Sequence, residues 1–196
     1  MRALPRIMVA PNGARLQKSD HPALPITEAE VVACAQACFA AGADGMHAHI
    51  RDATGQHLLD ATAYRALVSV LKEAVPQLAV QITTEAVGRY QPDVQMEVAL
   101  TSGADMVSVS IREILRAGPR AATEFFVACQ QAEIAVQHIL YDLSDCQALA
   151  ATLDRAMLTS PNLQLLYVLG RYSEGGASTA AELDPFLGWL AKEELS

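Results

Sequence analysis

The sequence predicts an α/β protein in which short apolar strands alternate with amphipathic helices around one parallel sheet. Two observations support this class. Six strand–helix units follow one another along the chain, and polar residues follow the end of each apolar strand. Strict alternation is typical of parallel sheets. In a (β/α) barrel the polar residues would face one mouth, and in an open doubly wound sheet they would line a crevice. No Gly-x-Gly-x-x-Gly opens a helix, which disfavours dinucleotide binding.

The hydrophobic pattern places the individual elements. The first helix is expected to begin at Thr27, where Glu30 completes a capping box, and to end within residues 40–44. Strands are expected at 6–10, in the stretch leading into 47–52, and at 78–83, 106–111, 134–141 and 163–169. The later helices are expected at 60–75, 93–102, 121–132, 144–157 and 179–194, the last bent near Pro185. No linker interrupts the pattern, so residues 1–196 are predicted to form a single domain.

Composition excludes several classes of function. The formal charge of -8 argues against nucleic-acid binding. No apolar run approaches the roughly 18 residues of a membrane span, and no secretory leader is visible at the N-terminus, so we expect a cytoplasmic protein. Cys34 and Cys38 lie four residues apart in a helical pattern, which favours small buried side chains over a metal site.

The second strand ends in two histidines, and this stretch is the strongest candidate site. Side chains alternate along a strand, so His47, His49 and Arg51 are expected on one face. Two neutral imidazoles on one face can bind one divalent metal. The alternative is that one histidine is structural and the other lies in a turn. The residues that follow, Arg51 and Asp52, favour the metal.

Several stretches together resemble the β-keto acid cleavage enzymes, a family of zinc-dependent (β/α)8 barrels. The matching residues are 11–15 (Pro-Asn-Gly-Ala-Arg), 21–25, 41–52 (with His-Ala-His-Ile-Arg-Asp), 81–85, 136–142 and 167–172. The resemblance implies a TIM-barrel-like parallel sheet of which six units are present, incomplete relative to the eight-stranded barrel. It further implies exchange of the acyl part of a β-keto acid with acetyl-CoA, giving acetoacetate and a new CoA thioester, in a homo-oligomer.

The resemblance also assigns roles to residues. It implies that His47 and His49 ligate Zn²⁺ or another divalent metal, that Thr83 and the backbone of Ala86 hold the substrate carboxylate, and that Ser108 and Ser110 face the keto acid. Arg15 lies where members that act on an amino-keto acid use a glutamate for the substrate amine. An arginine there is expected to disfavour a cationic substrate and to suit a neutral or anionic tail.

The chain departs from the family pattern at its C-terminal end. A Gly-x-Glu-Asp or Gly-x-Glu-Asn stretch, whose glutamate is the third zinc ligand, has no match after Gly170. The assisting arginine and acid of the same region are likewise expected to be absent. Glu113 is the best substitute as third ligand or base, and Arg51 is a further catalytic candidate. The alternative for Glu113 is a structural ion pair with Arg112, Arg116 or Arg51.

Two other functions stay open at this point. The chain could be a catalytically impaired metal-binding remnant or subunit, or another metal-dependent aldolase or hydrolase, because a barrel alone does not set the reaction. With two units fewer than a full barrel, the first and sixth strands would be left as edges. They could meet in a smaller barrel, or a partner chain could cover them.

Overall fold

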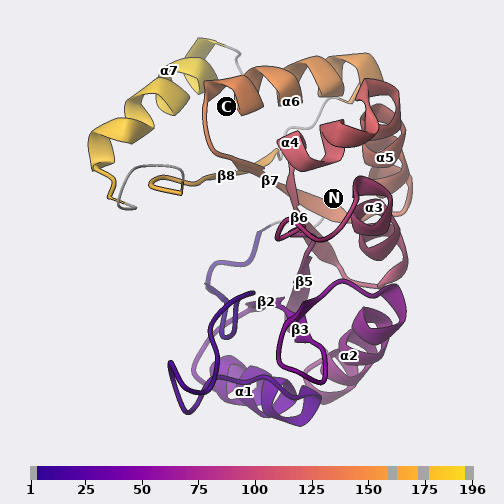
Figure 1. Ribbon diagram of the computed structural model, residues 1–196, viewed down its shortest axis with the longest axis vertical. Coiled ribbons are helices and arrows are strands. Elements are labelled where there is room, and N and C mark those ends of the chain that lie inside the picture. The colour runs from indigo at the N-terminus through magenta and orange to yellow at the C-terminus, as the bar shows by residue number, and fades with distance from the viewer. Residues whose placement is uncertain (1–3, 159–162, 172–176, 193–196) are drawn as a thin grey trace.

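The computed structural model describes residues 4–158, 163–171 and 177–192 (Figure 1). Its centre is a six-stranded parallel sheet with the order β1-β2-β5-β6-β7-β8, so the main strands pair in the order in which they occur in the chain. The sheet curls into about half of a barrel and stays open, which confirms the predicted incomplete barrel. These strands are β1 (Met8–Val9), β2 (Gly45–Ala48), β5 (Ala79–Thr83), β6 (Met106–Ser110), β7 (Ala135–Leu140) and β8 (Gln164–Tyr167).

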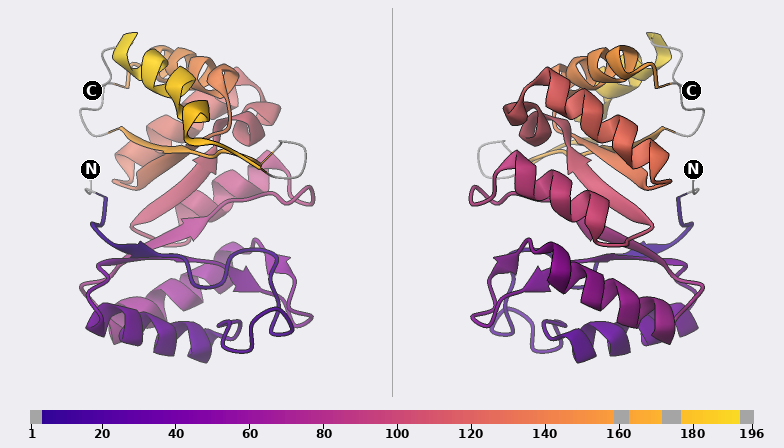
Figure 2. Two further views of the ribbon diagram at one scale, coloured as in Figure 1. Left: turned by 90° about the vertical axis from the view of Figure 1, so that its left-hand side faces the viewer. Right: turned by 90° about the vertical axis from the view of Figure 1, so that its right-hand side faces the viewer.

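Helices follow the strands and cover the convex side of the sheet (Figures 1 and 2). Capping fixes several of their starts: Thr27 and Glu30 form the expected capping box, and the Asp60 side chain accepts from the Ala63 amide. The helices are α1 (Glu28–Ala40), α2 (Ala61–Ala74), α3 (Pro92–Thr101), α4 (Ile111–Ile114), the 3₁₀ helix η1 (Leu115–Ala117), α5 (Pro119–Gln131), α6 (Leu143–Ala156), the 3₁₀ helix η3 (Ala180–Leu183) and α7 (Asp184–Lys192).

The two faces of the sheet differ in chemistry because alternate residues point to opposite sides. On β6, Val107 and Val109 belong to the main hydrophobic core, whereas Ser108 and Ser110 line the concave side. Ala122, Phe125 and Phe126 of α5 belong to the same core. The convex side therefore carries the hydrophobic core, and the concave side carries polar side chains of the alternate residues.

The structure corrects several expected boundaries. The strand predicted to run through 47–52 stops at Ala48, and β3 (Ile50–Arg51) turns away to pair with β4 (His57–Leu58) in a separate antiparallel hairpin. Helix α4 begins directly at Ile111, which the pattern had placed in a strand. Asp142, rather than Ser144, caps α6. The last predicted helix is divided between η3 and α7 just before Pro185. The parts of the predictions that fall on residues 172, 193 and 194 lie outside the described residues.

Strands β1 and β8 form the two edges of the open sheet and do not pair with each other. The sequence left open whether they would meet in a smaller barrel, and the described residues show that they do not. Across the ranges that the structure describes, no helix is long and apolar enough to cross a membrane.

Candidate functional site

A cavity of about 540 Å³ lies along the concave side of the sheet, at the carboxyl ends of its strands. All six strands, or the residues that follow them, contribute to its wall. Apart from Ala86 and Arg51, every site residue predicted from the sequence lines it. The lining residues include Arg15, His47, His49, Gln81, Thr83, Glu85, Ser108, Ser110, Glu113, Gln137, Tyr141 and Arg171. The parallel sheet thus brings together side chains that lie far apart in the sequence, as the barrel interpretation required.

The two histidines of the predicted metal site lie side by side in this cavity. The ring centroids of His47 and His49 are 4.8 Å apart, with planes inclined at 73°. Nδ1 of His47 lies 2.6 Å from Oε1 of Gln81, a side chain on the neighbouring strand β5. The backbone of His49 is held by Asn12, whose side chain accepts from the His49 amide and donates to the His49 carbonyl at 2.9 Å. A neighbouring strand therefore orients the ring of His47, and the loop after β1 fixes the backbone of His49.

Burial keeps both imidazoles in the form that binds metals. It lowers the pKa of His47 and is also the main reason why the pKa of His49 falls to about 2, with neighbouring His47 and His57 adding to the effect. The Nδ1 atom of His49 is buried and has no hydrogen-bond partner among the described residues. Neutral imidazole nitrogens with one oriented partner are typical metal ligands.

The spacing of the pair fits a shared divalent ion. Imidazole nitrogens bound to one Zn²⁺ at about 2.1 Å, roughly at right angles or wider, put the ring centroids about 5 Å apart, close to the 4.8 Å observed. The described residues contain no group of three His, Cys, Asp or Glu side chains placed to hold a metal. The pair thus fits as two ligands of an open site, and Glu113 is not brought up to it as a third.

Hydroxyl groups line the cavity beside the histidines. Ser108 and Ser110 are both buried on β6, and the hydroxyl of Ser110 has no hydrogen-bond partner in the described part of the chain. The Thr83 hydroxyl accepts from the Glu85 amide at 3.0 Å, which leaves its own proton free to be donated. These groups offer hydrogen-bond donors and acceptors on the wall of the cavity.

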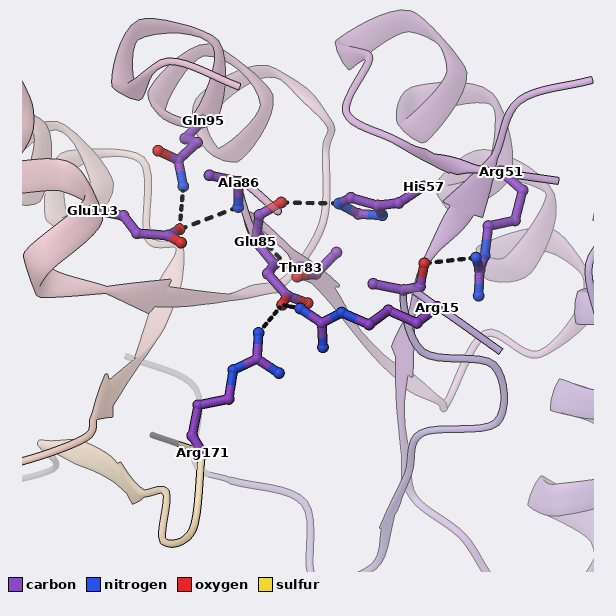
Figure 3. A network of polar contacts seen from close by, with 10 residues as sticks. Arg15, Arg51, His57, Thr83, Glu85, Ala86, Gln95, Glu113 and Arg171 are labelled. Carbon is purple, nitrogen blue, oxygen red and sulfur yellow. Dashed lines mark hydrogen bonds and ion pairs between the residues drawn. The ribbon is translucent and has the colours of Figure 1, made fainter. Parts of the chain in front are cut away.

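Glu113 reaches the cavity from α4 and is held by neutral donors (Figure 3). Its Oε2 accepts from the Ala86 amide at 3.1 Å and from Nε2 of Gln95 at 2.6 Å. None of the ion pairs considered from the sequence is found among the described residues. Arg112 pairs with Asp142 and Asp145, Arg116 donates to Gln91, and Arg51 donates to backbone carbonyls. The Ala86 amide, which was expected to help hold the substrate carboxylate, already donates to Glu113.

Arg15 and Arg171 meet above the cavity on a single carboxylate (Figure 3). The Nη2 atoms of Arg15 and Arg171 lie 2.7 and 3.0 Å from Oε1 of Glu85. Arg15 follows β1 and Arg171 follows β8, so the two edge strands of the sheet are linked through a residue that follows the central strand β5. Sequence reasoning singled out Arg15 but not Arg171 or Glu85 as site residues.

Arg51 is not where the alternation rule placed it. Because the chain turns into the β3–β4 hairpin after Ala48, the Arg51 guanidinium extends to the loop that follows β1 and donates to the carbonyls of Asn12 and Ala14, among others. Arg51 therefore fixes the loop that carries Arg15 and does not line the main cavity. The hairpin also supplies His57, which the sequence did not single out. Its Nε2 contacts the Glu85 carbonyl at 2.9 Å.

Comparison with known proteins identifies the family of this chain. Residues 6–194 match the family described as beta-keto acid cleavage enzyme. Two curated relatives are both named 3-keto-5-aminohexanoate cleavage enzyme. The one from Fusobacterium nucleatum is 31% identical over 72 residues and the one from Acetoanaerobium sticklandii is 32% identical over 72 residues. In each case the match covers 37% of this chain and 26% of the relative's length.

Solved structures support the fold. A ternary complex of ObcA with a C4-CoA adduct and oxalate superposes with a TM-score of 0.59 at 15% identity, covering 76% of this chain and 38% of that chain. A type I 3-dehydroquinate dehydratase from Clostridium difficile gives a TM-score of 0.54 at 10% identity, covering 87% of this chain and 77% of that chain. At such identities the likeness concerns the fold alone. Because the family match spans nearly the whole sequence, this chain belongs to the beta-keto acid cleavage enzyme family.

Proposed function

We propose that this protein exchanges the acyl part of a β-keto acid with acetyl-CoA, giving acetoacetate and the CoA thioester of the released acyl group. The carbon–carbon bond between the keto carbon and the CH₂–carboxylate unit breaks, and that unit forms a new bond to the acetyl carbon. The acyl group and CoA combine, so atoms balance without an external oxidant or reductant. The observation that carries the proposal is the placement of His47 and His49 in a cavity with hydroxyl donors and a carboxylate.

His47 and His49 would hold the divalent metal. When bound, the metal would polarise the substrate ketone and stabilise negative charge that develops on its oxygen. Gln81 and Asn12 keep the two histidines in place through the ring of His47 and the backbone of His49.

The remaining cavity residues would bind the substrate and move its proton. Thr83, Ser108 and Ser110 offer hydroxyls to the keto acid carboxylate and oxygen. We assign Glu113 as the base that begins the addition to acetyl-CoA. Its carboxylate faces the cavity while Gln95 and the Ala86 amide hold one of its oxygens. Arg15 is proposed to face the tail of the keto acid. Arg15→Glu should then shift preference toward amino-keto acids, and an unchanged preference would contradict this role.

An assay of the purified chain with acetyl-CoA and a panel of β-keto acids tests the function, with acetoacetate as the measured product. The metal content of the wild type is compared with that of His47→Ala and His49→Ala by elemental analysis. Bound metal without acetoacetate would favour a non-catalytic metal-binding protein. Turnover of the keto acid without acetyl-CoA would favour an aldolase or a hydrolase.

We also propose that the protein is a homo-oligomer of the cytoplasm. The open edges of the sheet support the oligomer, since β1 and β8 each leave one side without a partner strand among the described residues. Light scattering coupled to size-exclusion chromatography measures the mass, and a monomer across a wide concentration range would refute the oligomer.

A further inference from the structure

The arginine pair above the cavity carries more positive charge than its one partner neutralises. Two guanidinium groups share the single carboxylate of Glu85, and both contacts go to the same oxygen, Oε1. The two arginine side chains are 55% and 35% exposed, and Glu85 is 24% exposed. One positive charge of the three groups is left over. The cluster, whose contacts are drawn in Figure 3, is therefore a region of net positive charge on the wall of the cavity.

Most hydrogen-bond donors of the pair remain available. Within the described residues, Arg15 and Arg171 each make one hydrogen bond, through Nη2, although a guanidinium carries five N–H donors. Ion pairs exposed to this degree are weak, because water screens them. An incoming anion could therefore take up the free N–H groups of both arginines in the bidentate geometry that guanidinium offers to carboxylates.

The other charged groups of the cavity do not cancel this region. Glu113 is turned to the Ala86 amide and Gln95, and it makes no ion pair with either arginine. Arg112, which precedes Glu113 on α4 and does not line the cavity, is bound to Asp142 and Asp145. The arginines are thus the cationic side chains among the described lining residues, and they lie in the same cavity as the two histidines.

We propose that Arg15 and Arg171 bind a second carboxylate of the substrate, so that the preferred β-keto acids are dicarboxylic. This assignment rests on the proposed function and adds the substrate class. The first carboxylate and the ketone lie by the histidines and hydroxyls, and the distal carboxylate lies between the two guanidiniums. A phosphate of CoA has the same oxyanion chemistry. The shared cavity favours the keto acid, because the two arginines line the same cavity as the two histidines.

Binding is tested first with unreactive probes, so that catalysis is not needed. We expect adipate to bind about tenfold more tightly than hexanoate, the six-carbon acid with one carboxylate, in isothermal titration calorimetry. Arg171→Gln should remove this difference. Arg120→Gln is the matched control, since Arg120 is an exposed arginine paired with Glu124 on α5. Thermal unfolding of both variants shows whether the fold is kept. Equal binding of the two probes to the wild type would overturn the proposal.

Kinetics separates this proposal from the proposed function. With acetyl-CoA, 3-oxoadipate should show a KM about tenfold lower than 3-oxohexanoate, and Arg171→Gln should raise the KM for 3-oxoadipate alone. If both acids react equally well and the variant changes neither, the arginine site is refuted while the function stands. If neither reacts but adipate binding depends on Arg171, the function fails and the anion site stands. A higher KM for acetyl-CoA alone in the variant, absent with acetyl-dephospho-CoA, would assign the arginines to a CoA phosphate and overturn the proposal.

Discussion

Histidine occurs on both faces of the sheet, and the two faces surround it differently. His47 and His49 face the concave cavity, where Gln81 and Asn12 hold the ring of one and the backbone of the other. His138 lies on the convex face and is buried. The centroids of its ring and the Phe126 ring are 5.2 Å apart, and its Nδ1 has no hydrogen-bond partner among the described residues. A buried histidine becomes a candidate ligand only where polar neighbours orient it toward open space.

The largest expected effect on activity follows from removing the concave pair. Each of His47→Ala and His49→Ala should lose bound metal and acetoacetate formation together, because the described residues provide no third ligand that could replace the lost imidazole. Metal analysis and the acetyl-CoA assay measure the two losses. Full metal content in both variants would show that the concave histidines are not the metal ligands. The two faces of the sheet would then not differ in this function of their histidines.

The next largest effect is expected at the carboxylate proposed as base. Glu113→Gln keeps the shape of the side chain but cannot accept a proton, so kcat should fall by about 100-fold or more. Metal content should stay unchanged, since Glu113 is not placed as a ligand. The change is measured as kcat at saturating substrate. A kcat near that of the wild type would assign the residue a structural role through Gln95.

A smaller effect is expected at the residue that orients His47. Gln81→Leu removes the 2.6 Å contact to Nδ1 of His47, and outer-shell partners of this kind are worth about 10- to 100-fold in metal affinity. Competition with a chelator measures the affinity. Gln137→Leu serves as a control, because Gln137 contacts Gln81 at 3.2 Å but not the histidine. Equal losses in the two variants would argue for a general packing defect.

The convex histidine should affect stability and leave activity at neutral pH nearly unchanged. Burial lowers the pKa of His138 to about 4, so the unfolded chain binds its proton more readily, and stability is lost as pH falls from about 6.5 toward 4. Between pH 7 and pH 5 the wild type should therefore lose about 2 kcal/mol more unfolding free energy than His138→Leu. Urea unfolding at both pH values measures this. Equal losses of unfolding free energy in the wild type and in His138→Leu would show that protonation of His138 does not destabilise the folded protein.

The hydrophobic pattern predicted the central strands, and the family resemblance predicted that Thr83, Ser108 and Ser110 lie at the site. Alternation predicted the shared face of His47 and His49, because the period of two holds along an uninterrupted strand. It failed where the strand ends early. Asp52 accepts from the Thr54 and Gln56 amides and turns the chain into a hairpin, so Arg51 leaves the face that counting assigned to it. The Asp52–Gly55 turn was the available clue, since Gly55 adopts a φ of 79°.

The sequence could not predict contacts between side chains that lie on different helices, strands or loops. Gln81, Gln95 and Arg171 were not predicted as site residues, because their partners lie on other elements and no local pattern reveals them. Only the fold shows that Gln95 of α3 meets Glu113 of α4, or that Arg171 meets Arg15 across the open sheet. The choice between a closed and an open sheet was likewise undecided, because edge pairing depends on long-range geometry and not on local pattern.

The hydrogen bonds from Arg51 to backbone carbonyls affect how substrate specificity can change. The loop after β1 is clamped to the hairpin at several backbone points, so position 15 projects from a rigid platform. A different side chain at that position alters what meets the far end of a ligand without moving the imidazoles at its reacting end. Recognition and chemistry can then diversify separately within one scaffold.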